Sequence, residues 1–148
     1  MPKRFLVAVV TLPLLIAVTA SASPVVSTVS GPCDLARRSS ESTQHFMRRR
    51  ISCAVDRFGP VGGGTTRAIC IANRESGLDP TAESGSGMYL GLYQHAATMW
   101  PDRFKKWTNR SWGLSKRALN GRSNSIVTIR MVHAIGGWKA AGWPVKGC

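Results

Sequence analysis

One glutamate, Glu75, stands where an apolar helical pattern gives way to a loop rich in glycine. Ala68, Ala72 and Glu75 are spaced i, i+4 and i+7, so they share one face of a predicted helix. Asp79-Pro80 then turns the chain, and four glycines follow between Gly77 and Gly91. A carboxyl group on the last turn of a half-buried helix is poorly hydrated. Poor hydration favours the neutral form, which suits general acid catalysis.

The segment from Glu75 to Gln94 resembles the signature of the soluble lytic transglycosylase family, which belongs to the lysozyme-like superfamily. The family pattern runs E-S-x-[LF]-[DN]-P-x-A-x-S, then a short glycine-containing gap, then G-L-x-Q. The matching positions are Glu75, Ser76, Leu78, Asp79, Pro80, Ala82, Ser84, Gly91, Leu92 and Gln94. One residue is added in the gap, at Met88-Tyr89-Leu90. The alternative interpretation is a helix end followed by an ordinary Asp-Pro turn and a Gly/Ser loop.

The resemblance implies an activity. Lytic transglycosylases cut the β-1,4 bond between N-acetylmuramic acid and N-acetylglucosamine in peptidoglycan and form a 1,6-anhydro product. Carried onto this chain, Glu75 would act as general acid and then as general base. Ser84 and Gln94 match positions that contact substrate in the family. Tyr89 and Tyr93 are aromatic candidates beside the cleft, with packing as the equal alternative for each.

The chain departs from the family in one respect. Many members carry a later A-Y-N-A-G segment whose tyrosine lies near the catalytic acid, whereas residues 131–138 of this chain contain no tyrosine. Either Tyr89 or Tyr93 substitutes for it, or the reaction is hydrolysis. Glycosidases usually need two carboxylates. Among the seven acidic residues no partner for Glu75 is evident, because Asp79 is expected to form a turn and Glu83 to face solvent. A single-acid mechanism is therefore favoured.

The N-terminus has the pattern of a secretory signal peptide. Lys3 and Arg4 precede an apolar run from Phe5 to Ala20, and small residues follow to Ala22. Sixteen residues are few for a membrane span, although a retained anchor is the alternative. We therefore predict a signal peptide at 1–22, a flexible lead-in at 23–32 and one domain at 33–148. The protein is expected to be secreted or associated with the cell envelope.

The mature chain is strongly basic. Without Lys3 and Arg4, 18 basic residues stand against seven acidic ones, a net charge of +11. Such a surface attracts polyanions, and for an exported protein the envelope is where to expect one. We expect peptidoglycan glycan strands as the partner, no nucleic acid, no stable membrane insertion after signal removal, and a monomer. No cofactor is predicted, and no metal site, because the three histidines are scattered and no C-x-x-C pair exists.

Four cysteines in an exported chain predict two disulfides, for which three pairings are possible. Among these we favour Cys33–Cys53 as a local bridge and Cys70–Cys148 as a long one. The second bridge would fix the C-terminal tail to the helix that bears Glu75. Arg74 lies about 100° around that helix from Glu75 and need not pair with it.

The predicted fold class is mostly α (α+β), a lysozyme-like single domain with a small irregular or β element after the helix of Glu75. The last strong helix is apolar nearly all round and should form the buried centre. Trp138 and Trp143 beyond it are spaced to line a groove, with core packing as the alternative. The first predicted helix runs from about Cys33, capped by Asp34, to Phe58, and the second is capped by Thr65-Thr66 and ends near Ser76. A strand or hairpin is predicted within Tyr89–Gln94, followed by a helix over 101–107 and one or two helical turns over 115–120. The last helix is predicted over 125–135 and is capped by Ser123.

Three classes of function remain open. The leading hypothesis is a peptidoglycan-cleaving enzyme, either a lytic transglycosylase or a hydrolytic muramidase (lysozyme). The second is a non-catalytic cell-wall binding module of the same fold. The third is a cationic antimicrobial or membrane-active protein, which ranks last because the chain lacks a long basic amphipathic helix.

Overall fold

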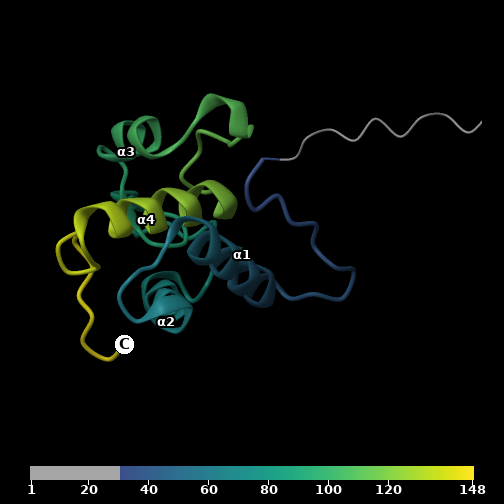
Figure 1. Cartoon of the computed structure of the whole chain (residues 1–148), viewed down its shortest axis with the longest axis horizontal. Coiled ribbons are helices and arrows are strands. Elements are labelled where there is room, and N and C mark those ends of the chain that lie inside the picture. The colour runs from purple at the N-terminus through teal and green to yellow at the C-terminus, as the bar shows by residue number, and fades with distance from the viewer. Residues whose placement is uncertain (1–30) are drawn as a thin grey trace, which may run out of the picture.

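The computed structural model describes residues 31–148, so the predicted signal peptide and nearly all of the lead-in lie outside the described residues. This part of the chain is mostly helical with one small antiparallel sheet, as expected (Figure 1). The elements are α1 (Thr43–Phe58), α2 (Gly64–Ser76), β1 (Tyr89–Leu90), β2 (His95–Ala96), α3 (Trp100–Trp107), the 3₁₀ helix η1 (Arg110–Trp112) and α4 (Gly121–Ile135). The two strands form a hairpin, of which β1 lies within the predicted stretch Tyr89–Gln94 and β2 begins one residue after it.

Helix α4 is the centre of the domain. It crosses the middle of Figure 1, with α3 above it and α1 and α2 below, and it contacts both α1 and α3. Ile126, Ile129 and Val132 are fully buried, and so are the polar side chains of Asn124 and Thr128. Nearly every residue from Gly121 to Val132 is buried, which confirms the prediction that this helix forms the buried centre, whereas residues 133–135 are exposed.

Helix α1 begins ten residues later than predicted. Ser42 caps it, with the Ser42 hydroxyl accepting from the N–H of His45 at 3.1 Å. Asp34 caps nothing and instead pairs with Arg122 at 3.3 Å. Cys33 has a positive φ of 55°, which no helix allows, so the segment before Ser42 is irregular. The prediction of a helix from Cys33 with Asp34 as its cap is wrong.

The other helix starts also differ from expectation. Gly63, with φ of 80°, precedes α2, and no side chain caps that helix, whereas Thr65-Thr66 was predicted to do so. Asn120 caps α4 by accepting from the N–H of Ser123, the residue predicted as the cap. Residues 115–120 form turns rather than helix, and the short helical segment lies earlier, at η1.

Both favoured disulfides are present. Cys33–Cys53 ties the irregular segment to α1, and Cys70–Cys148 ties the C-terminus to α2, each with the two Cα atoms 5.7 Å apart. Within residues 31–148, no helix is long and apolar enough to cross a membrane.

The tryptophans of the C-terminal tail belong to the core rather than to an open groove. Trp138 and Trp143 are 2% and 5% exposed, and their rings lie 5.8 and 6.1 Å from the ring of Tyr93. The Trp143 indole N–H donates to the carbonyl of Tyr93 at 2.9 Å. Their π faces are therefore covered by the protein, so stacking on a sugar is not available to them.

Candidate functional site

Glu75 lies on the last turn of α2, as the spacing predicted. Ala68, Ile71 and Ala72 bury the inner face of that helix. Gly77 ends it in the left-handed conformation, with φ of 64° and its N–H bonded to the carbonyl of Asn73. The Glu75 side chain is 24% exposed, so its carboxylate lies at the edge of the core and reaches solvent.

The loop after α2 is fixed by residues of the same sequence pattern. The Ser76 hydroxyl donates to the carbonyl of Leu92 at 2.8 Å, which joins the end of α2 to the hairpin. The Gln94 amide donates to the carbonyls of Ala82 at 3.2 Å and Gly91 at 2.9 Å. The Gly91 N–H also donates to Ala82, at 2.7 Å. The segment therefore folds as one hydrogen-bonded unit beside Glu75.

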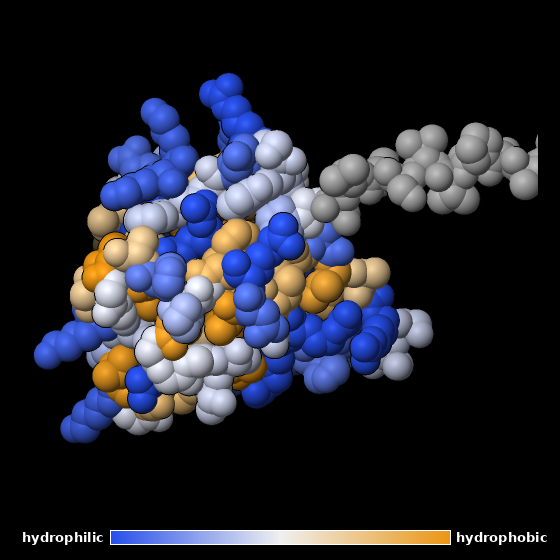
Figure 2. Space-filling view, in the orientation of Figure 1, coloured by the Kyte–Doolittle hydropathy of each residue, from blue (hydrophilic) through white to orange (hydrophobic). Residues whose placement is uncertain are grey.

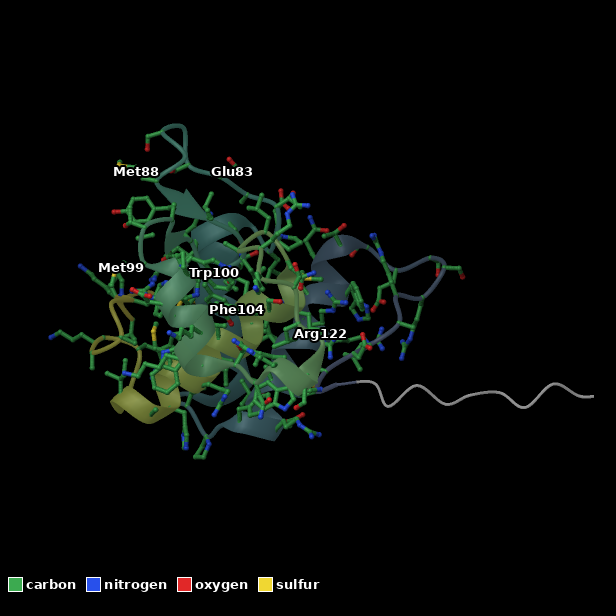
Figure 3. All side chains as sticks on the ribbon, turned by 90° about the horizontal axis from the view of Figure 1, so that it is seen from above. Glu83, Met88, Met99, Trp100, Phe104 and Arg122 are labelled. Atoms are coloured by element: carbon green, nitrogen blue, oxygen red, sulfur yellow. A yellow bond between two sulfur atoms is a disulfide. The ribbon has the colours of Figure 1, made fainter. Side chains whose placement is uncertain are left out.

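Asp79 and Ser84 shape the same loop. An Asp79 carboxylate oxygen accepts from the N–H and the hydroxyl of Thr81, at 2.8 and 2.7 Å, which is the turn-forming role expected of it. The Ser84 hydroxyl accepts from the N–H of Tyr89 at 3.0 Å. Both Ser84 and Gln94, predicted as substrate-binding residues, thus have their polar groups engaged in holding the loop. Glu83 is exposed, as predicted (Figure 3).

Tyr89 and Tyr93 differ in their exposure to solvent. Tyr89 on β1 is 47% exposed beside Met88, which is 60% exposed, and remains open to a ligand. Tyr93 is fully buried, and its hydroxyl donates to the carbonyl of Ala68 at 3.0 Å. Burial raises the pKa of Tyr93 well above its ordinary value. Ala68 lies two helical turns before Glu75, about 10 Å along the axis. The expectation that Tyr93 binds substrate or replaces the family tyrosine is therefore wrong.

Arg74 pairs with Glu75, although helix geometry did not require the pair. Its guanidinium Nη2 lies 3.1 Å from Glu75 Oε1, and its Nε lies 3.4 Å from the same oxygen. The same guanidinium donates to the carbonyls of Pro144 at 2.6 Å and Lys146 at 3.1 Å. The Cα positions diverge by about 100°, but these tail carbonyls draw the long side chain back towards Glu75.

A buried polar network supports the hairpin from α4. The Asn124 side chain accepts from the N–H of Tyr93 at 3.0 Å and donates to the carbonyl of Ala118 at 2.9 Å. The Thr128 hydroxyl donates to the Asn124 carbonyl, so it accepts from Nε2 of His95, at 2.7 Å. Sequence reasoning missed this network, although two polar residues at i and i+4 in an otherwise apolar helix were a usable signal.

His95 is fully buried and packs against the ring of Trp100. Its Nδ1 lies 2.9 Å from an Arg103 nitrogen, which can only donate, so the ring carries its proton on Nε2. Burial, with Arg103 adding to it, lowers the pKa of His95 to about 3. The neutral ring therefore has no acid–base role near pH 7. Among residues 31–148 no three side chains of the metal-ligating types gather into a possible metal site.

Two surface cavities lie away from Glu75. One of about 810 Å³ opens between α3 and residues 108–116; its lining includes Trp100, Phe104, Lys105, Arg110, Leu114 and Lys116 (Figure 3). Another of about 620 Å³ is lined by Arg67, Trp138 and Val145, among others. Glu75 lines neither of them. Its carboxylate reaches solvent beside the loop and lies outside both cavities.

Comparison of the chain with protein-family models, with curated proteins and with solved structures found no match. The chemistry of the site follows from its own groups. A carboxyl group that reaches solvent, is held by one guanidinium and lies beside a hydrogen-bonded loop can transfer a proton to and from a bound ligand.

Proposed function

We propose that this protein is an exported peptidoglycan-cleaving enzyme, a lytic transglycosylase with a lysozyme-like domain, in which Glu75 is the catalytic acid. The observation that carries the proposal is that the polar side chains of the Glu75–Gln94 segment have two different roles. Ser76, Asp79 and Gln94 are engaged in hydrogen bonds that shape the loop. Glu75 makes no hydrogen bond to that loop, and its carboxylate reaches solvent next to it.

In the proposed reaction Glu75 gives its proton to the glycosidic oxygen as the bond to the muramic acid anomeric carbon breaks. The departing N-acetylglucosamine keeps that proton as its hydroxyl hydrogen. The muramic acid 6-hydroxyl then bonds to the anomeric carbon and returns its proton to the Glu75 carboxylate. The product is a 1,6-anhydro sugar, no water is consumed, and the enzyme ends in its starting state.

A hydrolytic muramidase is the second candidate, and the position of Tyr93 favours it. With the Tyr93 hydroxyl committed to Ala68, Tyr89 is the one remaining tyrosine of the chain that could assist the 6-hydroxyl. If Tyr89 does not approach the bound sugar, water can take the place of the 6-hydroxyl at the anomeric carbon. The product would then be an ordinary reducing end.

Charge and cysteine usage support an envelope setting. Both disulfides are typical of proteins that fold in oxidising compartments. Figure 2 shows long hydrophilic side chains standing off the surface over α3 and the segment after it, where Lys105, Lys106 and Arg110 are exposed. Such a surface would hold the protein on the anionic polymers of a cell wall.

The test is mass spectrometry of the soluble fragments that the protein releases from purified peptidoglycan. Glu75→Gln removes the proton donor, and Glu83→Gln is the matched control, because Glu83 is an exposed carboxylate of the same loop. We expect anhydro-muramic ends from the wild type and Glu83→Gln and none from Glu75→Gln. Fragments heavier by one water would establish the muramidase. A wild type that binds the wall but releases nothing would refute both and favour a binding module.

A further inference from the structure

The C-terminal tail and Glu75 are joined through a single side chain. Arg74 uses its three nitrogens on three oxygen acceptors, a Glu75 carboxylate oxygen and the carbonyls of Pro144 and Lys146, and one of these nitrogens also lies 4.0 Å from the Cys148 sulfur. Both carbonyls are backbone groups, so their direction depends on the path of the tail and not on any rotamer. The guanidinium is therefore oriented by the tail and presented to Glu75.

The tail that holds Arg74 is itself anchored at both ends. On one side Trp143 is buried, and its indole N–H donates to the carbonyl of Tyr93 at 2.9 Å. On the other side Cys148 is bonded to Cys70, and Arg67 donates to the Cys148 carbonyl at 3.3 Å. Only four residues lie between these anchors, and they contain the two carbonyls that Arg74 binds. The arrangement leaves the guanidinium little freedom to turn away from Glu75.

We propose that Arg74 is a positioning residue for Glu75 and that the disulfide-anchored tail is the support that holds it in place. The inference rests on the proposed function, because it assigns Arg74 a part in the same proton transfer. A glutamate side chain that is 24% exposed would otherwise sample several rotamers. Two contacts from the planar Arg74 guanidinium to Oε1 restrict the Glu75 carboxylate to one rotamer.

Arg74 also matches the charge that appears during the reaction. When Glu75 gives up its proton, a carboxylate is left, and a guanidinium already at 3.1 Å stabilises that negative charge without moving. In the second half of the reaction the same contact keeps the carboxylate aimed while it recovers a proton. Within the described chain Arg74 is the only ion-pair partner of Glu75, so no other cation there takes over this task.

A purely structural role, in which Arg74 only fastens the tail, is the competing explanation, and Arg67 provides the control for it. Arg67 and Arg74 both extend from α2 to the tail, seven residues apart, but Arg67 makes no bond to Glu75. Arg67→Met therefore weakens the fastening and leaves the carboxylate contact intact. Arg74→Met removes both. Arg74→Lys keeps a positive charge near Glu75 but loses the planar fork that reaches three acceptors.

The experiment measures kcat and KM on soluble, uncrosslinked glycan strands for the wild type, Arg74→Met, Arg74→Lys and Arg67→Met, with Glu75→Gln as the inactive reference. For Arg74→Met we expect kcat to fall by about 10-fold or more, since misorientation of a catalytic group is costly. KM should stay unchanged because Arg74 orients the acid and not the sugar. Arg74→Lys should lie between Arg74→Met and the wild type, and Arg67→Met should match the wild type.

The split between kcat and KM provides the readout that a structural role would not move. Loss of the contact with Glu75 Oε1 should lower kcat at an unchanged KM in Arg74→Met, whereas a loosened tail alone should leave both constants as they are in Arg67→Met. Unchanged kcat in Arg74→Met, or an equal loss in Arg67→Met, would overturn the positioning role alone. A wild type that releases no more than Glu75→Gln would instead refute the proposed function and this role with it.

Discussion

The disulfide between Cys70 and Cys148 should be the stronger of the two covalent links. It closes a sequence separation of 78 residues, against 20 for Cys33–Cys53. A cross-link stabilises the fold by lowering the entropy of the unfolded chain, and the effect grows with the logarithm of the loop length. For these loops the relation gives about 4.5 and about 3.3 kcal/mol at 25 °C. The double alanine variant of the long bridge should therefore lose about 1 kcal/mol more than that of the short one.

The measurement is unfolding in urea without reductant, followed by tryptophan fluorescence, for the wild type and the two double variants. Trp143 and Trp138 are buried beside Tyr93, close to the tail that Cys148 anchors, so their emission should report global unfolding. An equal loss in the two variants, or a larger loss for Cys33 and Cys53, would show that chain entropy does not govern their stability. Local packing of the short bridge would then be the dominant contribution.

Two further predictions concern the buried polar groups. Replacing Asn124 by leucine leaves the N–H of Tyr93 buried without a partner and should cost about 3 kcal/mol in urea unfolding. Ser125→Ala should cost well under that, because its hydroxyl only returns to its own helix, and a similar loss from both would contradict the argument. Burial, with Arg103 adding to it, lowers the pKa of His95 to about 3, so the unfolded chain binds a proton that the native state does not. Stability should therefore fall as pH drops from about 6.5, by about 1.4 kcal/mol per unit, and a flat urea midpoint between pH 6.5 and 4.5 would refute this.

Glu41 should make its contribution to acid stability in a lower pH range, which overlaps that of His95 below about pH 4.5. Burial alone would raise its pKa, but hydrogen bonds from the Arg38 backbone, Arg49 and His45 outweigh burial and lower that pKa from 4.5 to about 2. A lowered folded pKa means that the stabilisation is complete above the unfolded value and is lost as pH falls through this range. Glu41→Gln should therefore flatten the stability profile below about pH 4.5 and leave its slope above that value unchanged, as urea midpoints at each pH would test.

The sequence was informative where one physical signal dominated. The apolar circumference of α4 required burial on every side, and the position of Gly77 agreed with the end of α2. Helix starts were harder, because several residues that can cap stand close together. Ser42 caps α1, and Asn120 rather than Ser123 caps α4, although each of these residue types can cap a helix. Which residue becomes the cap depends on where the preceding chain is held. Before α1 the chain is held by the Cys33–Cys53 disulfide. The pairing was predicted, but the residues around Ser42 do not indicate that this bridge delays the start of the helix.

The place of Glu75 on the last turn of α2 was predicted, whereas the burial of Tyr93 and the pairing of Arg74 were not, for a related reason. The position of Glu75 follows from helical spacing, whereas Tyr93 lies in a segment too short to show any period. The burial of the Tyr93 side chain could therefore not be predicted. The pairing of Arg74 with Glu75 depends on carbonyls some 70 residues later in the chain. A prediction from α2 by itself has no access to those acceptors, and the correct disulfide pairing was the one sequence-level hint that the tail comes near.

The added residue in the sequence pattern falls in a loop whose two sides are joined by hydrogen bonds. Ser84 and Tyr89 close a short tip: the Ser84 N–H donates to the Tyr89 carbonyl at 3.0 Å, and the Ser84 hydroxyl accepts the Tyr89 N–H. Figure 3 labels Met88 at the outer end of this loop. The position of the added residue, Met88-Tyr89-Leu90, lies between Ala82 and Gly91, and the bonds of Gly91 and Gln94 to Ala82 close the loop behind it. The loop therefore accommodates the added residue on the side of these bonds away from Glu75.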